Sequence, residues 1–127
     1  MKIIEGIRYS KDHEWVKFDG DTATVGITDF AQHNLGEIVY VELPAPGAEM
    51  KAGDAIGVVE SVKSASDIYT PVAGKVVRVN EELSDSPEKI NAEPYESWIA
   101  VLQFEGGSAP DGLMDAAEYE AFCEAEG

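Results

Sequence analysis

The sequence predicts a compact, β-rich sandwich or barrel made by one domain. Short runs of β-branched and aromatic residues recur along most of the chain, and clusters of Gly, Pro, Asn and Asp separate them. Apolar residues at helical spacing extend over several turns only near the carboxyl terminus. Many short strands with few helices pack into sandwiches or barrels, and 127 residues with 44% hydrophobic content suffice for one core.

The first third of the chain is expected to hold strands at residues 13–18, 22–28 and 37–43. The first two strands are joined by a turn at Asp19–Asp21 and form a hairpin. A short helix follows them, because Thr28 or Asp29 can cap its start and Gly36 can end it after Leu35.

The run from Gly57 to Asn80 is expected to form the central hairpin, over residues 56–79, with Lys63 at its bend. Apolar strand formers precede and follow the bend, and Gly and Pro bound them. The neighbours of Lys63 are small: Ser61, Ser64, Ala65 and Ser66. A lysine at such a tip is accessible to a modifying enzyme. The alternative interpretation is that Lys63 is an ordinary exposed lysine without a function.

In the last third of the chain, Ser86 and Pro87 predict the start of a short helix. A strand is expected over residues 98–104 and a terminal helix over about residues 112–125. A loop at Gly106, Gly107 and Pro110 precedes that terminal helix. The residues of its apolar stripe are Leu113, Met114, Ala117, Ala121 and Phe122. Cys123 and five aromatic residues are assigned to the core: Trp15, Phe30, Tyr40, Trp98 and Phe104.

The composition disfavours several classes of function. A formal charge of −16, from 25 acidic and 9 basic residues, opposes binding to nucleic-acid phosphates. No apolar run approaches the roughly 20 residues that span a bilayer, and the amino terminus has neither a signal nor a transit peptide pattern. One cysteine cannot form an internal disulfide, so a reducing, cytoplasmic location is expected. No metal-ligand cluster and no catalytic motif stands out, and an enzyme is not expected.

Three stretches resemble one known family, the H protein of the glycine cleavage system. The lysine hairpin reads ESVKSASDIYTPVAGKV and resembles that family's lipoyl-attachment hairpin. The flanking stretches are similar as well: YSKDHEWVKFDGDTATVGITDFAQHNLGEIVYVELPAPG and INAEPYESWIAVL. Lys63 follows Val62, whereas oxo-acid dehydrogenase carriers usually have Asp there and biotin carriers Met, and this favours the H protein.

The resemblance implies a barrel-sandwich hybrid of the lipoyl and biotinyl carrier type, over residues 1–127, with the terminal helix packed outside. It implies that a lipoate ligase or lipoyl transferase joins lipoic acid to Lys63 through an amide bond. The arm would take an aminomethyl group from glycine decarboxylase (P protein) to the aminomethyltransferase (T protein). Dihydrolipoamide dehydrogenase (L protein) would then reoxidise the dithiol. A bacterial, monomeric carrier without catalysis of its own is expected.

Four further residues are candidates for roles at this site. Glu14 and Asp67 match positions where the family supplies carboxylates, and we hypothesise that they hold the ammonium group of the cargo. The alternative is that both are ordinary exposed acids. His33 is a candidate for lining the same cleft, with a structural role as the alternative. Glu60 is a candidate for recognition by the ligase, with a solvated strand residue as the alternative.

Three other functions remain open from the sequence. A relay that passes lipoyl groups to other enzymes would need the same arm as a glycine-cleavage shuttle. A biotin or oxo-acid dehydrogenase carrier would use a similar hairpin. An acidic interaction domain would carry no modification at all. The intact mass of the native protein separates a lipoyl shuttle, a biotin carrier and an unmodified domain, and reconstitution with the other three glycine-cleavage proteins separates the shuttle from the relay.

Overall fold

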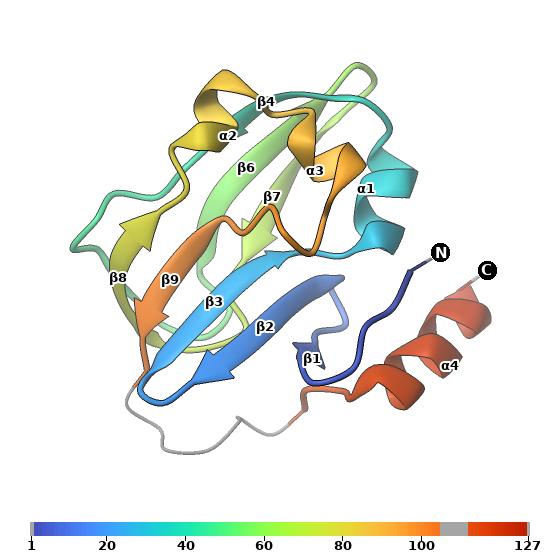
Figure 1. The fold of residues 1–127 in the computed structure, drawn as a ribbon, viewed down its shortest axis with the longest axis horizontal. Helices are drawn as coiled ribbons and strands as arrows, with labels where there is room; N and C mark the ends of the chain where they lie inside the picture. Colours follow the sequence, from blue (N-terminus) through green and yellow to red (C-terminus); the bar gives the residue numbers. More distant parts are fainter. Residues whose placement is uncertain (1, 105–111, 127) are drawn as a thin grey trace.

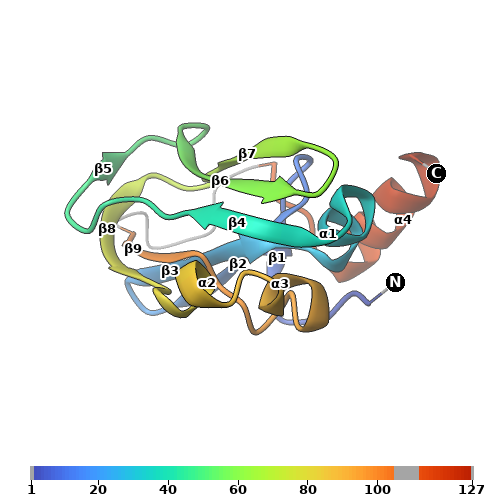
Figure 2. The same cartoon turned by 90° about the horizontal axis from the view of Figure 1, so that it is seen from above.

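The computed structural model describes residues 2–104 and 112–126, which form two antiparallel sheets (Figure 1). One sheet has the strand order β1-β2-β3-β9-β8-β5, and the other has the order β4-β6-β7. Figure 2 shows the smaller sheet as a layer above the larger one, with α4 at one end of the molecule. The predicted β-rich fold with short helices and a terminal helix is confirmed.

The elements have the following bounds. The larger sheet contains β1 (Arg8–Tyr9), β2 (Glu14–Asp19), β3 (Thr22–Ile27), β5 (Glu49–Met50), β8 (Gly74–Val79) and β9 (Ala100–Gln103). The smaller sheet contains β4 (Ile38–Glu42), β6 (Ala55–Ser61) and β7 (Ala65–Tyr69). The helices are α1 (Asp29–Leu35), α2 (Glu82–Asp85), α3 (Lys89–Ala92) and α4 (Ala116–Glu126).

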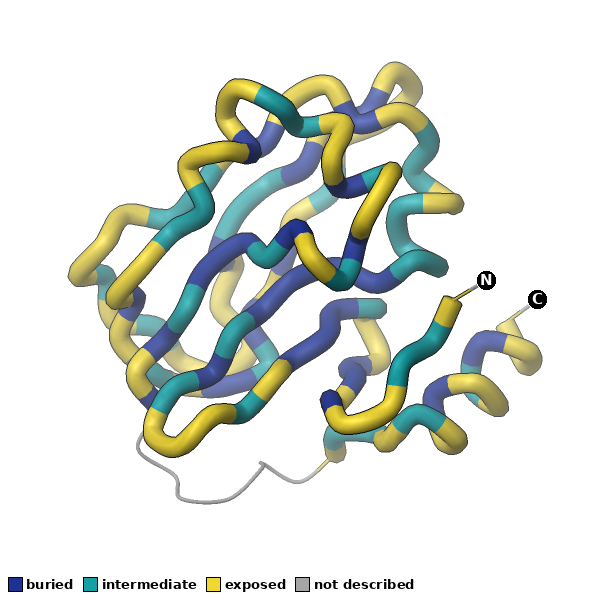
Figure 3. Tube along the Cα trace, in the orientation of Figure 1, coloured by how far each residue is buried: buried dark blue, intermediate teal, exposed yellow. Residues whose placement is uncertain are grey.

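The main core lies between the two sheets, where alternate strand residues are buried (Figure 3). Val25 on β3, Val59 on β6 and Leu102 on β9 are almost completely buried there. A second cluster forms where α4 covers β1 and β2, around Tyr9, Trp15 and Tyr119. The terminal helix is therefore packed outside the two-sheet core, on its own apolar cluster.

Helix α1 forms as its end signals predict. The Thr28 hydroxyl accepts a hydrogen bond of 3.2 Å from the Ala31 N–H, which is the expected amino-terminal cap. Gly36 ends the helix with a φ of 87°, in the left-handed region that glycine tolerates best. This cap places the end of α1 beside the tip of the central hairpin.

The central hairpin is shorter than the expected residues 56–79. Strands β6 and β7 pair with each other over residues 55–69, whereas β8 belongs to the other sheet and pairs with β9. Gly57 lets β6 approach β4, because a Cβ at that position would lie 2.5 Å from the Glu42 carbonyl oxygen. Gly74 has the same role beside Gln103, at 2.4 Å.

The terminal helix begins at Ala116, later than the expected residue 112. Met114 is held outside the helix because it forms a β-bridge with Tyr9. The buried residues of α4 are Tyr119 and Cys123, while Ala117 and Ala121 are exposed, so the predicted apolar stripe was wrong at these positions. The predicted burial of Cys123 is confirmed, at 2% exposure.

Three other expectations differ from the structure. Helix α2 was not expected, and the short helix after Ser86 is capped at Glu88 without a side-chain hydrogen bond. Tyr40 was assigned to the core but is 51% exposed, because an irregular pairing between Ile38 and Tyr40 turns it outward. The predicted loop at Gly106, Gly107 and Pro110 lies outside the described residues.

Within the described segments of the chain, no helix is long and apolar enough to cross a membrane.

Candidate functional site

Lys63 lies exposed at the turn between β6 and β7. The turn is closed by the Ser61 N–H, which donates to the Ser64 carbonyl oxygen at 2.7 Å. The Ser61 hydroxyl oxygen also accepts from the backbone N–H groups of Lys63 and Ser64, at 3.3 and 3.1 Å. The backbone beneath the lysine is thus fixed, while its side chain projects from the turn.

Two contacts join this turn to neighbouring elements. The Val62 N–H donates to the Glu37 carbonyl oxygen at 3.0 Å, just before β4. The Lys63 side chain passes close to Gly36, since a Cβ on Gly36 would lie 3.5 Å from the Lys63 Cε. Val62 is 65% exposed, so the surface beside the lysine is apolar and open.

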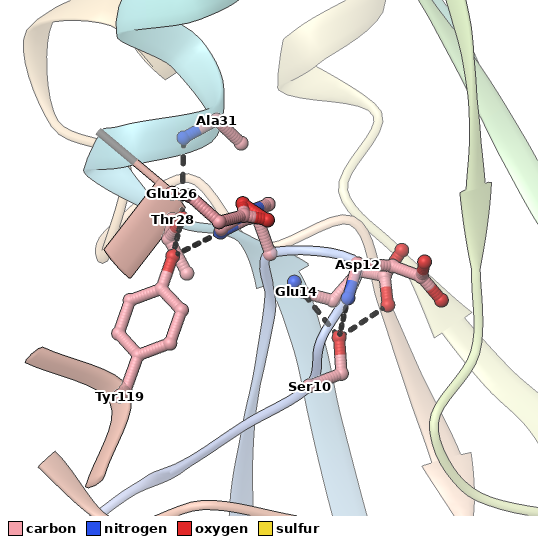
Figure 4. A network of polar contacts seen from close by, with 8 residues as sticks. Ser10, Asp12, Glu14, Thr28, Ala31, Tyr119 and Glu126 are labelled. Carbon is pink, nitrogen blue, oxygen red and sulfur yellow. Dashed lines mark hydrogen bonds and ion pairs between the residues drawn. The ribbon is translucent and has the colours of Figure 1, made fainter. Parts of the chain in front are cut away.

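Glu14 is buried at the start of β2, with only 3% of its surface exposed. One carboxylate oxygen accepts from the Ser10 hydroxyl at 2.7 Å, and the other accepts from the Tyr69 N–H at 3.1 Å. In Figure 4, dashed lines join the Ser10 oxygen to Glu14 and Asp12, whose N–H groups both donate to it. Burial raises the pKa of Glu14 to about 7, and the two hydrogen bonds oppose this rise.

Asp67 differs from Glu14 because it is exposed. It lies on β7 between the lysine turn and Tyr69, and its carboxylate is 3.5 Å from the Tyr69 hydroxyl. Glu14 contacts the backbone of the same tyrosine. The structure therefore brings both predicted carboxylates to Tyr69, one buried below the edge of β7 and one on its surface.

His33 and Glu60 lie apart from Glu14. His33 is exposed on α1 and lines a hollow of about 560 Å³ with residues of α4, including Cys123 and Glu126. Glu60 is exposed on β6, opposite Ala65 on one side and Tyr40 on the other. It lies on the outer face of the smaller sheet, close to the lysine turn.

Sequence reasoning missed three residues that shape the site: Ser10, His13 and Tyr69. Ser10 precedes Glu14 by four residues, so their proximity could have been inferred from a tight turn. The contact between Tyr69 and Glu14 spans 55 positions and gives no local signal. His13 has a φ of 65°, and no local pattern in the sequence predicts this value.

The site offers a primary amine on a hydrogen-bonded turn and a buried carboxyl whose pKa burial raises to about 7. Within residues 2–104 and 112–126, no three His, Cys, Asp or Glu side chains are placed to hold a metal ion. Two packed sheets with a lysine at a hairpin tip define a class of proteins: small carriers that bear a prosthetic group on a lysine.

Comparisons with known proteins specify the family within this class. The family model described as "Glycine cleavage H-protein" matches residues 7–126. The chain is 58% identical to the glycine cleavage system H protein of Thermoanaerobacter pseudethanolicus, over 99% of this chain and 100% of that one. It is 55% identical to the protein of the same name from Alkaliphilus oremlandii, over 99% of each chain.

A solved structure agrees with this result. The crystal structure of a glycine cleavage system H protein from Mycobacterium marinum superimposes with a TM-score of 0.88. The two chains are 34% identical, and the match covers 96% of this chain and 99% of the other. This chain belongs to the glycine cleavage H-protein family. Family membership supports a carrier role in glycine cleavage.

Proposed function

We propose that this protein is the lipoyl-carrying shuttle of glycine cleavage, with lipoic acid joined to Lys63 by an amide bond. The observation that carries the proposal is the position of Lys63, exposed on a turn whose backbone Ser61 fixes. A modifying enzyme can reach such an amine, and so can several later partners. Membership of the H-protein family supplies the reaction in which the carrier takes part.

The residues around Lys63 fit a long, flexible acyl group. Gly36 lies against the lysine side chain, and the turn neighbours Ser64 and Ala65 are small, so they leave space beside the amine. When bound, the lipoyl group supplies the thiol chemistry that accepts and releases an aminomethyl group. The chain's own residues present that group, orient it and keep water from it.

Glu14 and Asp67 hold the amine of the cargo in this proposal. A cargo ammonium beside Glu14 would favour the ionised carboxylate and so oppose the pKa rise that burial causes. Asp67 adds a second carboxylate on the path from the lysine turn along β7, at the surface. A buried, water-poor location for one end of the cargo would also slow its loss by hydrolysis.

The surface near Lys63 fits transient docking on basic partners. Val39 and Tyr40 on β4 are exposed together with Val62, at 50%, 51% and 65%. The chain as a whole carries a formal charge of −16, which speeds the encounter with positively charged surfaces. The partners proposed are glycine decarboxylase, the aminomethyltransferase, dihydrolipoamide dehydrogenase and the lipoate-attaching enzyme, in the bacterial cytoplasm. The carrier contributes no catalytic group of its own.

The intact mass of protein purified from its native host tests the attachment. We expect the added mass of one lipoyl group in the wild type and in Lys51→Arg, a matched change at another exposed turn lysine. We expect no addition in Lys63→Arg. Lipoylation that persists in Lys63→Arg would refute the assignment.

Reconstitution with the three other glycine-cleavage proteins tests the shuttle role. Glycine breakdown should require lipoylated wild-type protein and fail with Lys63→Arg. A lipoylated protein that does not support glycine breakdown, yet donates its lipoyl group to other enzymes, would instead be a lipoyl relay.

A further inference from the structure

His13 has an unusual backbone conformation directly before Glu14. Among the described residues, it is the one non-glycine residue with a positive φ, at 65°. Histidine is one of the residue types that enter this region more often, but the conformation still costs energy and must be held by its surroundings. The contacts of His13 therefore indicate what stabilises its positive φ.

The backbone contacts of His13 form a tight turn from Ser10 to Glu14. The His13 N–H donates to the Ser10 carbonyl oxygen at 3.2 Å, and the Ser10 N–H donates to the Glu14 carbonyl oxygen at 2.9 Å. The Thr28 N–H donates to the His13 carbonyl oxygen at 3.1 Å. Glu14 leaves this turn with its carboxylate directed to Ser10 and to the backbone of Tyr69.

The His13 ring is held by side chains from α1 and α4. Its Nδ1 lies 2.7 Å from the Tyr119 hydroxyl, and its Nε2 lies 3.0 Å from a carboxylate oxygen of Glu126. The ring also stacks on Phe30, with centroids 4.3 Å apart. Tyr119 is in turn 2.7 Å from the Thr28 hydroxyl, which caps α1 (Figure 4).

The following arrangement of protons satisfies the contacts that link Thr28, Tyr119, His13 and Glu126. Thr28 donates to Tyr119, Tyr119 donates to Nδ1 of His13, and the Nε2–H of His13 donates to Glu126. Burial raises the pKa of Tyr119, so its hydroxyl keeps the proton that this arrangement needs. The terminal helix thus contacts, through one histidine ring, the turn that carries Glu14.

We propose that His13 is a positioning residue for Glu14: its ring, bonded to Tyr119 of α4, holds the Ser10–Glu14 turn so that the Glu14 carboxylate stays buried against Tyr69. This proposal rests on the proposed function only in the role of Glu14, which is to hold the amine of the cargo. The positioning itself is a property of the protein without cargo. The terminal helix thereby acts on the cargo site although the carboxylate of Glu14 is hydrogen-bonded to Ser10 and Tyr69, which lie outside that helix.

The test compares His13→Gly with His13→Asn in the folded, unloaded protein. Glycine accepts the positive φ but offers no side chain, whereas asparagine also tolerates it and places an acceptor oxygen near the position of Nδ1. The readouts are the pKa of Glu14, from carboxyl carbon NMR, and the exchange rate of the Tyr69 amide proton. In His13→Gly we expect the pKa to fall from about 7 towards 4.5 and the amide to exchange at least tenfold faster.

His13→Asn should retain more of the raised pKa of Glu14 than His13→Gly does. His33→Asn, a change at the other histidine of the chain, should leave both readouts unchanged. An unchanged pKa of Glu14 in His13→Gly, or equal values in the Gly and Asn variants, would overturn the proposal.

Tyr119→Phe removes the hydroxyl partner of His13 while keeping an aromatic ring. It decides the question if His13→Gly does not fold: a lowered pKa of Glu14 supports the proposal, and an unchanged one overturns it. All these measurements use protein without cargo, so their failure is distinct from failure of the proposed function. The proposed function would fail separately, if lipoylation or glycine breakdown persisted in Lys63→Arg.

Discussion

The Glu14 carboxylate accepts a 3.1 Å hydrogen bond from the Tyr69 N–H and so joins β2 of the larger sheet to β7 of the smaller one. Tyr69 is the last residue of β7, the strand that leads from the lysine turn. The contact therefore places a buried acid at the far end of the strand that begins beside Lys63. Its burial raises the pKa of Glu14 to about 7, which makes the site responsive to pH.

The raised pKa of Glu14 predicts a pH-dependent contribution to stability. Between pH 4.5 and about 7 the folded state holds a proton on Glu14 that the unfolded state has lost, so stability falls as the pH rises. The contribution is full below pH 4.5 and is lost above 7, and it amounts to about 3 kcal/mol. Glu14→Gln mimics the protonated acid, because its amide can donate to Ser10 and accept from Tyr69.

Urea unfolding of both proteins between pH 4 and 8 measures this contribution. The free energy of unfolding of Glu14→Gln relative to the wild type should rise across that window by about 3 kcal/mol. The subtraction removes the titration of the other acids, which both proteins share. A difference that stays constant with pH would show that Glu14 titrates normally in the folded state.

Glu14 and Asp67 should differ in their effect on the lifetime of the loaded protein. Glu14→Gln removes a buried charge that we propose to face the cargo ammonium, so the loaded form should decay several-fold faster. Asp67→Asn removes an exposed charge, which is worth roughly 0.2–1 kcal/mol and at most about fivefold. Glu81→Gln, at an exposed acid after β8, is the control. Equal lifetimes in all four proteins would exclude a carboxylate role in holding the cargo.

Local signals in the sequence predicted the parts of the fold that depend on local chemistry. The limits of α1 follow from the cap at Thr28 and the left-handed residue Gly36, both within a turn of the helix. The start of α4 does not, because the bridge between Met114 and Tyr9 decides it from the other end of the chain. Tyr40 was misassigned because an irregular pairing with β6 changes which face it occupies.

The site shows the same division. The position of Lys63 at a bend follows from the strand pattern on either side of it, and the structure places it there. The burial of Glu14 does not follow from the pattern, since its environment is built by Tyr69 and by the turn at Ser10. His13 was overlooked because its ring contacts the Tyr119 hydroxyl, which lies 106 positions away and gives no local signal.

Ser61 is predicted to control the order of the lysine turn. Ser61→Ala removes the oxygen that accepts from Lys63 and Ser64, at a cost of about 1–2 kcal/mol in the free energy of unfolding. The lipoylation rate should fall several-fold, because the modifying enzyme then meets a looser turn. Ser64→Ala is the matched control, since Ser64 is exposed and takes part through its backbone. Rates that are equal for the two variants would show that order of this turn is unimportant for modification.

Gly57 is predicted to be required for the spacing of β4 and β6. In Gly57→Ala the new Cβ would lie 2.5 Å from the Glu42 carbonyl oxygen, so a strand must shift, at a cost of about 3 kcal/mol. Gly53→Ala is the comparison, because its φ is 93° but nothing lies within 4 Å of the added carbon. Its cost should be about 1–2 kcal/mol, from the backbone alone. Amide exchange in β4 should increase only in Gly57→Ala. If Gly57→Ala lost less stability than Gly53→Ala, the explanation by close approach of the two strands would be contradicted.

Glu60 is predicted to assist recognition by the lipoate-attaching enzyme. It is exposed on the outer face of the smaller sheet, one residue before the start of the Ser61–Ser64 turn, where a basic surface of that enzyme could approach it. Glu60→Gln should slow lipoylation two- to fivefold at low salt, and the difference should shrink at high salt because exposed charges are screened, with a Debye length of about 3 Å at 1 M. Glu42→Gln, an exposed acid on β4 farther from the turn, should have a smaller effect. If both variants were lipoylated at the wild-type rate at every salt concentration, Glu60 would be a solvated strand residue and recognition would depend on the turn itself.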